Sequence, residues 1–258
     1  MKFCGISISV LLIFSGLICQ SQVLDVYPFE TGEILKYKIR YGWFTIGEAE
    51  VNHEYPSKAD TFNVNVVAYT TGIVNWIAPL YDSLSTSIDK STLHPVRAYA
   101  NRREGKDRRK ELDFFDFERD TAQMIVFEDD QIVKERMVAI NDSLYDMLST
   151  YAFLRTRDYG RMSPGDSLMM KVYYEGRRYD FGIEYEQLVK KETLLGEVNT
   201  HAMYILFPIS GTFPKPHMVK VWVTADEHQV PVLIEAQMKF GKARCELIEW
   251  KRGIDVEY

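Results

Sequence analysis

The chain has 258 residues, with 31 Lys and Arg against 37 Asp and Glu and a formal net charge of −6. This acidic balance argues against nucleic acid and anionic lipid headgroups as general partners, because both attract clustered positive charge. Length alone does not require two domains, since a single β-rich domain can be this long.

Residues 1–21 have the pattern of a secretory signal peptide. Lys2 supplies one positive charge, and residues 6–18 then form an apolar run that is too short to span a bilayer, which takes about 20 apolar residues. We place the cleavage site between Ser21 and Gln22. We therefore expect a periplasmic or outer-membrane-associated protein.

Cys19 offers an alternative, because a lipoprotein leader would make this residue the acylated one. Such a leader needs a small residue just before the cysteine, and Ile18 is not small. We favour soluble export over a lipid anchor. Cys245 then remains as the one cysteine of the mature sequence, so no internal disulfide is expected.

The mature chain, residues 22–258, shows the two-residue alternation of β-strands. In residues 35–41 four apolar side chains alternate with three cations, which puts the apolar set on one face of a sheet and the charges in water. Further strands are expected, in chain order, at 47–55, 62–66, 84–89, 96–102, 111–117, 124–127, 132–138, 168–175, 178–185, 188–194, 200–207, 218–224, 230–240 and 243–251. Their short connections indicate antiparallel pairing, because parallel strands need long crossovers.

Residues 143–158 predict a helix. Ser143, with Asp146 three residues later, is an acceptable capping-box start, and Gly160 with the following Pro-Gly pair ends the segment. The apolar residues fall at spacings of three and four and form one stripe: Leu144, Met147, Leu148, Tyr151, Ala152 and Leu154. We expect this helix to cover one end of the sheet; the alternative is a movable lid over an apolar cavity.

Two segments repeat one pattern of strand, acidic turn, proline and strand. The first contains Asp89 and Pro95, and the second contains Asp226 and Pro231. In each we expect the aspartate to bond nearby backbone and the proline to begin the returning strand, where no ladder donor is required. The repeat fits either an old duplication or a common hairpin.

Short motifs spread over most of the mature chain carry a family resemblance. They are Phe29-x-x-Gly32-Glu33-x-Leu35-x-Tyr37, Gly47-x-Ala49, Tyr81-Asp82, Ile88-Asp89, Thr92-Leu93-x-Pro95, Glu104-Gly105, Leu154-Arg155, Gly165-Asp166 and Trp222-Val223-Thr224 with Pro231. Their order and spacing resemble the domain of unknown function 3108. That family is exported and bacterial and its function is unassigned, so the resemblance implies a compartment and brings no catalytic residues.

A more distant similarity is to outer-membrane lipoprotein carriers, which share hairpins that hold a tryptophan, an aspartate and a proline, here Trp222, Asp226 and Pro231. This similarity implies one antiparallel sheet curved into an open half-barrel whose inside holds acyl chains. The present chain departs from those carriers by being longer and by having one clear helix.

We therefore expect an all-β fold with one main helix, arranged as a large curved antiparallel sheet or an open half-barrel. Residues 22–258 would form a single domain. The alternative is two similar β halves, residues 22–140 and 160–258, joined by the helix at 143–158.

Two apolar segments, residues 71–81 and 208–214, suggest a ligand site. A contiguous exposed apolar patch usually marks an interaction site, and we expect these segments to form the rim of an apolar cleft on the concave side of the sheet. Core packing under long loops is the alternative. The candidate ligand-binding residues are Trp43, Phe44, Ile73, Trp76, Ile77, Leu80, Tyr81 and Phe213.

Candidate polar contacts are Asp82, Arg97 and Arg102, because Asp82 begins a strand and could pair with either arginine. A structural ion pair explains this set at least as well as catalysis does. Residues 102–110 carry six cations against two acids and could meet a phosphate or an acidic glycan. We favour a solvated hairpin tip whose charges discourage edge-to-edge pairing.

The sequence contains no pattern typical of a catalytic or metal site. The five histidines lie outside the short spacings that metal motifs use, and the mature chain has no Gly-x-Ser-x-Gly elbow, P-loop or His-Glu-x-x-His. We expect no metal, no cofactor and no enzymatic activity. The histidines are His53, His94, His201, His217 and His228.

These observations favour a non-catalytic cell-envelope protein that binds an apolar or amphiphilic ligand, such as a lipid, lipoprotein or glycolipid, in a β-sheet cleft. The first alternative is an interaction module that docks on an outer-membrane protein or a surface-polymer assembly, with peripheral contact to the membrane. An enzyme acting on envelope glycans through Asp82 and its neighbours is the least favoured.

Overall fold

The computed structural model of the chain describes residues 28, 30–56, 58–140, 144–208 and 215–253. The expected signal peptide, its cleavage site, Cys19, Ser143 and Phe213 lie outside the described residues. Within the described part the chain forms fifteen strands, two α-helices and one 3-10 helix. In this part no helix is long and apolar enough to cross a membrane.

The strands follow the sequence-based prediction closely. The first eight are β1 (Ile34–Tyr41), β2 (Phe44–Glu54), β3 (Thr61–Thr70), β4 (Leu80–Asp89), β5 (Pro95–Glu104), β6 (Asp107–Asp116), β7 (Thr121–Glu128) and β8 (Gln131–Ala139). The other seven are β9 (Leu144–Tyr145), β10 (Ser167–Tyr174), β11 (Arg177–Thr193), β12 (Gly196–Leu206), β13 (Val219–Thr224), β14 (Pro231–Gln237) and β15 (Lys242–Lys251). The helices are α1 (Gly72–Ile77), α2 (Met147–Arg155) and the 3-10 helix η1 (Tyr159–Arg161).

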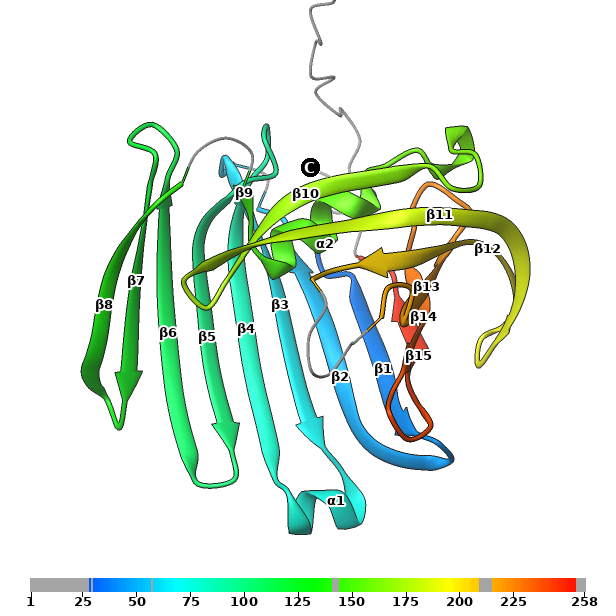
Figure 1. Cartoon of the computed structure of the whole chain (residues 1–258), viewed down its shortest axis with the longest axis horizontal. Coiled ribbons are helices and arrows are strands. Elements are labelled where there is room, and N and C mark those ends of the chain that lie inside the picture. The colour runs from blue at the N-terminus through cyan, green and yellow to red at the C-terminus, as the bar shows by residue number, and fades with distance from the viewer. Residues whose placement is uncertain (1–27, 29, 57, 141–143, 209–214, 254–258) are drawn as a thin grey trace, which may run out of the picture.

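All fifteen described strands belong to one sheet with the order β8-β7-β6-β5-β4-β3-β2-β1-β15-β14-β13-β12-β11-β10-β9. The first and last strands, β1 and β15, pair at its middle, and the chain runs outward from there in both directions (Figure 1). Neighbouring strands are antiparallel except β9 and β10, which are parallel. The expected antiparallel all-β fold is confirmed.

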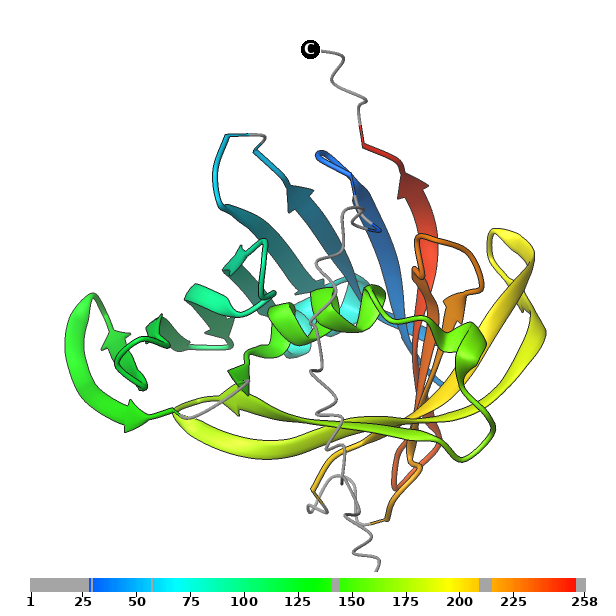
Figure 2. The ribbon, with the colours of Figure 1, turned by 90° about the horizontal axis from the view of Figure 1, so that it is seen from above.

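The sheet has two arms, the first formed by β1–β8 and the second by β9–β15. It curves around α2, which lies in the hollow between these arms (Figure 2). The arms meet through side chains: the rings of Phe115 and Tyr173 lie 5.2 Å apart, and the Tyr173 hydroxyl donates a 2.9 Å hydrogen bond to Asp113. In the described part the edge strands β8 and β9 are not joined by a backbone ladder. The fold is therefore an open half-barrel, as expected.

One face of α2 packs against the first arm of the sheet. Leu148 and Ala152 from the helix contact Phe62 and Val64 of β3 and Ile88 of β4. These strand residues fall on alternate positions, so their side chains share the concave face. This core fixes α2 against β3 and β4 and leaves its opposite face toward β10–β14.

The helix is shorter than the sequence predicted. Leu144 and Tyr145 form β9 because they pair with β10, and Asp146 is the N-cap. The Asp146 side chain accepts a 2.7 Å hydrogen bond from the Ser149 backbone N–H, and the Ser149 hydroxyl accepts a 2.8 Å bond from the Asp146 N–H. This reciprocal capping box satisfies two donors that a helix start leaves open.

Two further elements differ from the prediction. The segments expected as two strands at 178–185 and 188–194 form one strand, β11, whose pairing with β12 shifts between Tyr185 and Gln187. Residues 72–77, expected as an apolar loop, form the single helical turn α1, in which none of the described residues is buried.

The two repeated hairpins have the predicted turns. Asp89 accepts hydrogen bonds from the backbone N–H groups two and three residues later, and Asp226 does the same. Pro95 begins β5 and Pro231 begins β14, each beside a register shift in the ladder. The division of the chain into two similar halves stays a prediction.

Candidate ligand cavity

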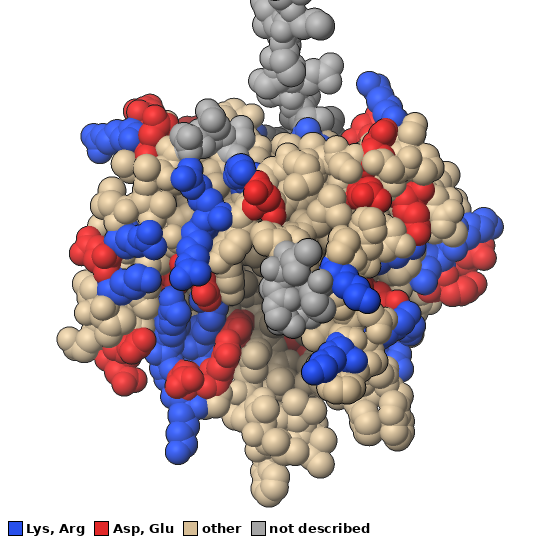
Figure 3. Space-filling model, viewed as in Figure 1, with Lys and Arg blue, Asp and Glu red and all other residues tan. Residues whose placement is uncertain are grey.

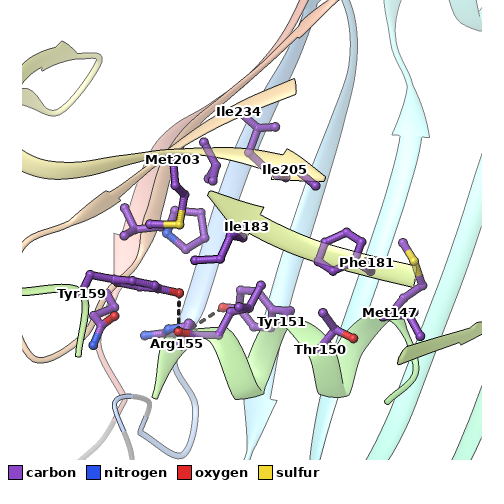
Figure 4. A pocket seen from close by; sticks show the side chains of 16 residues that line it. Met147, Thr150, Tyr151, Arg155, Tyr159, Phe181, Ile183, Met203, Ile205 and Ile234 are labelled. Carbon is purple, nitrogen blue, oxygen red and sulfur yellow. Dashed lines mark hydrogen bonds between the residues drawn. The ribbon is translucent and has the colours of Figure 1, made fainter. Parts of the chain in front are cut away.

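A cavity of about 290 Å³ lies between α2 and strands β10–β14 (Figure 4). The helix forms one wall and the second arm of the sheet forms the opposite wall. Sixteen residues line it: Met147, Thr150, Tyr151, Leu154, Arg155, Tyr159, Val172, Phe181, Ile183, Met203, Ile205, Val221, Val223, Gln229, Pro231 and Ile234.

The sequence period explains why this cavity is apolar. On α2, Met147, Tyr151 and Leu154 are four and three residues apart and share a helix face. On the strands the lining residues are two apart, as Ile183 follows Phe181 in β11, so their side chains point to the same side of the sheet. In Figure 4 the side chains labelled on the helix and on β11 and β12 point toward one another across the cavity.

Two polar atoms in the cavity wall have no hydrogen-bond partner among the described residues. They are the hydroxyl of Thr150, which is buried on α2, and the side-chain carbonyl oxygen of Gln229, in the β13–β14 turn. A buried polar group without a partner costs about 1–3 kcal/mol. Both atoms have almost no accessible surface, so a guest reaches either one only after that side chain rotates toward the cavity; a hydrogen bond formed there would recover that free energy.

Arg155 closes one end of the cavity and is itself fully engaged. It is 2% exposed, and its guanidinium forms a bidentate pair with Glu33, with distances of 2.6 and 3.1 Å. Its remaining N–H groups donate to the Tyr151 hydroxyl and to the backbone carbonyls of Pro28 and His228, each at 2.9 Å. Arg155 therefore ties the last turn of α2 to the middle of the sheet.

Glu33 is the centre of this buried network, just before β1. It also receives hydrogen bonds from Trp250 of β15 and from His53 of β2, each at 3.0 Å. Burial alone would raise the pKa of Glu33, but the bonds from His53 and Arg155 and the Arg155 charge outweigh it and lower this pKa to about 2. Burial lowers the pKa of His53, so its ring is neutral at neutral pH. The network is a structural joint that holds a wall of the cavity.

A second, much smaller cavity of about 50 Å³ lies on the other side of α2, and Glu111, Asp113 and Asp146 are among its lining residues. All three carboxylates are buried. Burial, together with the negative charge of Glu111, raises the pKa of Asp113 to about 7. At roughly 30 Å³ per water this space has the volume of one or two water molecules. Within the described residues no cluster of His, Cys, Asp or Glu is arranged to hold a metal ion.

The apolar residues proposed from the sequence lie elsewhere than the large cavity. Trp43 lies in the β1–β2 turn and Phe44 begins β2, whereas Ile73, Trp76 and Ile77 belong to α1; all five are exposed. Leu80 is half-buried and Tyr81 exposed at the start of β4, and Phe213 lies outside the described residues. None of the described members of this set lines the 290 Å³ cavity, because the turns carry them to the end of the sheet. Their role in ligand contact stays a prediction.

The polar candidates are distributed over β4 and β5. Asp82 accepts a 3.3 Å hydrogen bond from the Arg103 backbone N–H. Arg97 is exposed over the ring of Phe114 at 5.6 Å. Arg102 lies 3.6 Å from Glu175 and 4.0 Å from Glu111, so its ion pairs point into the small cavity.

Sequence reasoning missed the sixteen residues that line the cavity. The sequence did contain a signal for them, namely the apolar alternation in β11–β13 and the apolar stripe of α2. In the structure these two apolar faces lie opposite each other and line the cavity. Glu33 and Arg155 also stood in the motifs Gly32-Glu33 and Leu154-Arg155, which carried the family resemblance. The structure shows that these motif residues, 122 positions apart, meet in the core.

The family model described as Protein of unknown function (DUF3108) matches residues 36–248. The chain belongs to this family. A search of curated proteins found no sequence match.

Two solved structures resemble the fold. One is a β-barrel-like protein of the domain of unknown function DUF1849 from Brucella abortus, with a TM-score of 0.62, 8% identity and coverage of 88% of this chain and 99% of that chain. The other is a protein from Bacteroides fragilis described as exported and of YmcC-like fold, with a TM-score of 0.34, 13% identity and coverage of 88% and 98%. The first similarity supports the barrel-like fold alone, and the second is too low in TM-score to support a conclusion.

Proposed function

We propose that this chain is a non-catalytic cell-envelope protein that binds one apolar or amphiphilic molecule in the cavity between α2 and β10–β14. The observation that carries the proposal is a 290 Å³ apolar space whose wall holds two unpartnered polar atoms. Apolar cavities of roughly 150 Å³ already bind benzene-sized guests, and ligand pockets begin at roughly 300 Å³.

The polar atoms favour a guest with a neutral polar group. Gln229 offers a carbonyl oxygen that accepts a hydrogen bond, and the Thr150 hydroxyl can donate or accept one. Arg155 is engaged by Glu33, so none of the described lining residues offers a free cation to compensate the desolvation of a buried carboxylate or phosphate. A hydroxyl- or amide-bearing acyl chain, as in an acylglycerol or glycolipid, fits these groups.

The carboxylates near the cavities do not support an enzymatic function. Both oxygens of Glu33 accept hydrogen bonds from Arg155, and its low pKa makes it a poor general acid or base. Asp113 has the pKa of a candidate acid, but it is buried beside the smaller cavity and already accepts the Tyr173 hydroxyl hydrogen bond. Export and envelope location rest on the signal-peptide pattern of residues 1–21.

Displacement of the neutral fluorescent probe N-phenylnaphthylamine by a monoacylglycerol tests the cavity. Val221→Phe adds volume on the cavity wall and is expected to weaken binding by roughly tenfold or more, because it occupies the guest's space without adding charge. The matched control is Val133→Phe on the exposed strand β8, which should bind as the wild type does.

Thr150→Val supplies the polar arm of the same experiment. It should weaken monoacylglycerol binding several-fold and leave the probe itself unaffected, because the hydroxyl serves the polar group alone. Thermal unfolding of each variant checks the fold. No saturable binding by the wild type, or equal binding by Val221→Phe, would overturn the proposal.

A further inference from the structure

One end of the half-barrel gathers four turn segments from both arms of the sheet: the β1–β2 turn, α1 between β3 and β4, the β5–β6 turn and the β14–β15 turn (Figure 1). Backbone hydrogen bonds join neighbouring segments: Gly42 N–H to Lys242 O at 2.8 Å, Thr71 N–H to Ile46 O at 3.1 Å, and Gly105 N–H to Pro79 O at 2.8 Å. The four segments therefore form one continuous rim.

This rim carries large apolar side chains that stand in water. Trp76 is 89% exposed, Trp43 79% and Phe240 74%. We call these the apolar tip, together with three further exposed residues: Phe44, Ile73 and Ile77. Single exposed apolar residues need no explanation, but a contiguous group marks an interaction site.

The shape of the apolar tip suits a bilayer surface better than a protein partner. Its residues stand on three separate protruding segments, and α1 has no buried residue. The rings of Trp43 and Phe44 are tilted against each other by 36°, with centroids 4.2 Å apart, and both remain exposed. A protein partner is usually recognised by a packed pocket or groove, whereas tryptophan on protruding turns suits the boundary between lipid headgroups and acyl chains.

Cations flank the apolar tip on two sides. Arg103, Lys106 and Arg108 lie in or beside the β5–β6 turn, and Lys239 and Lys242 lie in or beside the β14–β15 turn, where Lys242 is paired with Glu235 at 2.6 Å. In the four segments, residues 41–46, 71–79, 103–108 and 238–242, five cations stand against two acids, and Asp129 and Asp130 of the neighbouring β7–β8 turn share a surface hollow with Arg103 and Arg108. Lys106 and Lys239 form no ion pair among the described residues, so they are the cations available to a partner. Figure 3 shows the uncharged protrusion at this end with a column of basic side chains beside it, among which acidic ones are interspersed.

The negative net charge of the whole chain does not oppose this local excess. Salt screens charges beyond about 10 Å, so a surface that touches the rim experiences mainly the charges of these four segments and of the acids beside them, Asp129, Asp130 and Glu235. Among these charges, those of Lys106 and Lys239 are complementary to anionic headgroups, which attract each nearby lysine or arginine.

We propose that this rim docks on the surface of a lipid bilayer that contains anionic lipid, with the apolar tip in the headgroup boundary and the flanking cations on the headgroups. This site is distinct from the ligand cavity, and none of its six tip residues lines that cavity. The docking surface would hold the half-barrel where an amphiphile is available.

Co-sedimentation with vesicles of phosphatidylcholine alone and of phosphatidylcholine mixed with phosphatidylglycerol tests the proposal. The wild-type chain should bind the mixed vesicles more tightly, and the difference should shrink at high salt. Trp76→Ser/Ile77→Ser should weaken binding to the mixed vesicles by roughly tenfold or more, because two large side chains leave the boundary. Lys106→Glu/Lys239→Glu should weaken binding to the mixed vesicles and leave binding to phosphatidylcholine unchanged.

Ile132→Ser/Val133→Ser is the matched control, because both residues are exposed on the edge strand β8. It should bind vesicles as the wild type does. Each rim variant should bind N-phenylnaphthylamine and release it to a monoacylglycerol as the wild type does. This result separates loss of docking from loss of the fold or of the cavity. Absence of vesicle binding, equal binding to both vesicle types, or normal binding by Trp76→Ser/Ile77→Ser would overturn the proposal.

Discussion

Arg155 shows how a buried charge positions the helix that walls the cavity. Its guanidinium and the Glu33 carboxylate are almost fully buried, and each satisfies the other with two hydrogen bonds. Removing one partner of such a pair leaves an uncompensated charge in the interior, which costs about 3–5 kcal/mol. The pair therefore specifies where α2 ends and how it sits on the sheet.

Arg155→Met should lower the free energy of unfolding by about 3–5 kcal/mol in a urea titration, because Glu33 loses its bidentate partner. Arg157→Met is the control: Arg157 lies 4.1 Å from the Phe153 ring and is half-buried, so about 1 kcal/mol or less is expected. The double variant Arg155→Met/Glu33→Gln should lose less free energy of unfolding than the two single variants lose in sum. An Arg155→Met variant within 1 kcal/mol of wild type would contradict this role.

Asp113 gives the fold a pH dependence. Its pKa is raised from 3.8 in the unfolded chain to about 7 in the folded protein, because it is buried beside Glu111. A carboxyl with a raised pKa favours folding fully below the unfolded value, and that contribution is lost as the pH rises through about 7. Asp113→Asn keeps an oxygen that can accept the Tyr173 hydrogen bond and removes the titration.

The variant should therefore gain stability relative to wild type between pH 4 and pH 8, reaching a few kcal/mol at the upper end, since one pKa unit corresponds to about 1.4 kcal/mol. Chemical denaturation of both proteins at several pH values measures the difference. Asp130→Asn is the control, because the hydrogen bond from Lys110 lowers the pKa of Asp130 and gives no gain at pH 8. A difference that does not change with pH would count against a buried, protonated Asp113.

At the scale of elements, alternation predicted nearly all of the sheet. Segments such as 35–41 are half-buried, and a half-buried strand must repeat every two residues. The same rule did not predict β9, because two residues are too few to show a period. The helix was found from its stripe but placed too long, since Leu144 and Tyr145 satisfy the same spacing while pairing with β10.

The ligand site was harder to predict for a physical reason. An apolar residue that lines a cavity has the same pattern as one that packs in a core, and the difference depends on how far α2 lies from β11–β13. Exposure is likewise invisible in sequence: Trp76 and Ile77 have the composition of a buried loop yet project from the end of the sheet. Sequence thus singled out Trp76 and Ile77, whose role in ligand contact stays a prediction, and did not find the cavity.

At the scale of the whole molecule, the open half-barrel combines two features that a packed sandwich lacks. Its two arms are bridged by side chains such as Phe115 and Tyr173 and not closed by a ladder, within the part of the chain that the structure describes. A single helix then fills only part of the hollow and leaves the apolar cavity on one side. This incomplete filling is the basis of the proposed carrier or binding role.

Native mass spectrometry of the chain purified from its own envelope tests that role most directly. The wild type and Val133→Phe should carry one small amphiphile per chain, and Val221→Phe, purified in the same way, should have lost it. The bound mass should dissociate as a neutral acyl-bearing molecule. A wild-type chain that appears bare, or an adduct that persists in Val221→Phe, would contradict the proposal that this cavity holds a guest.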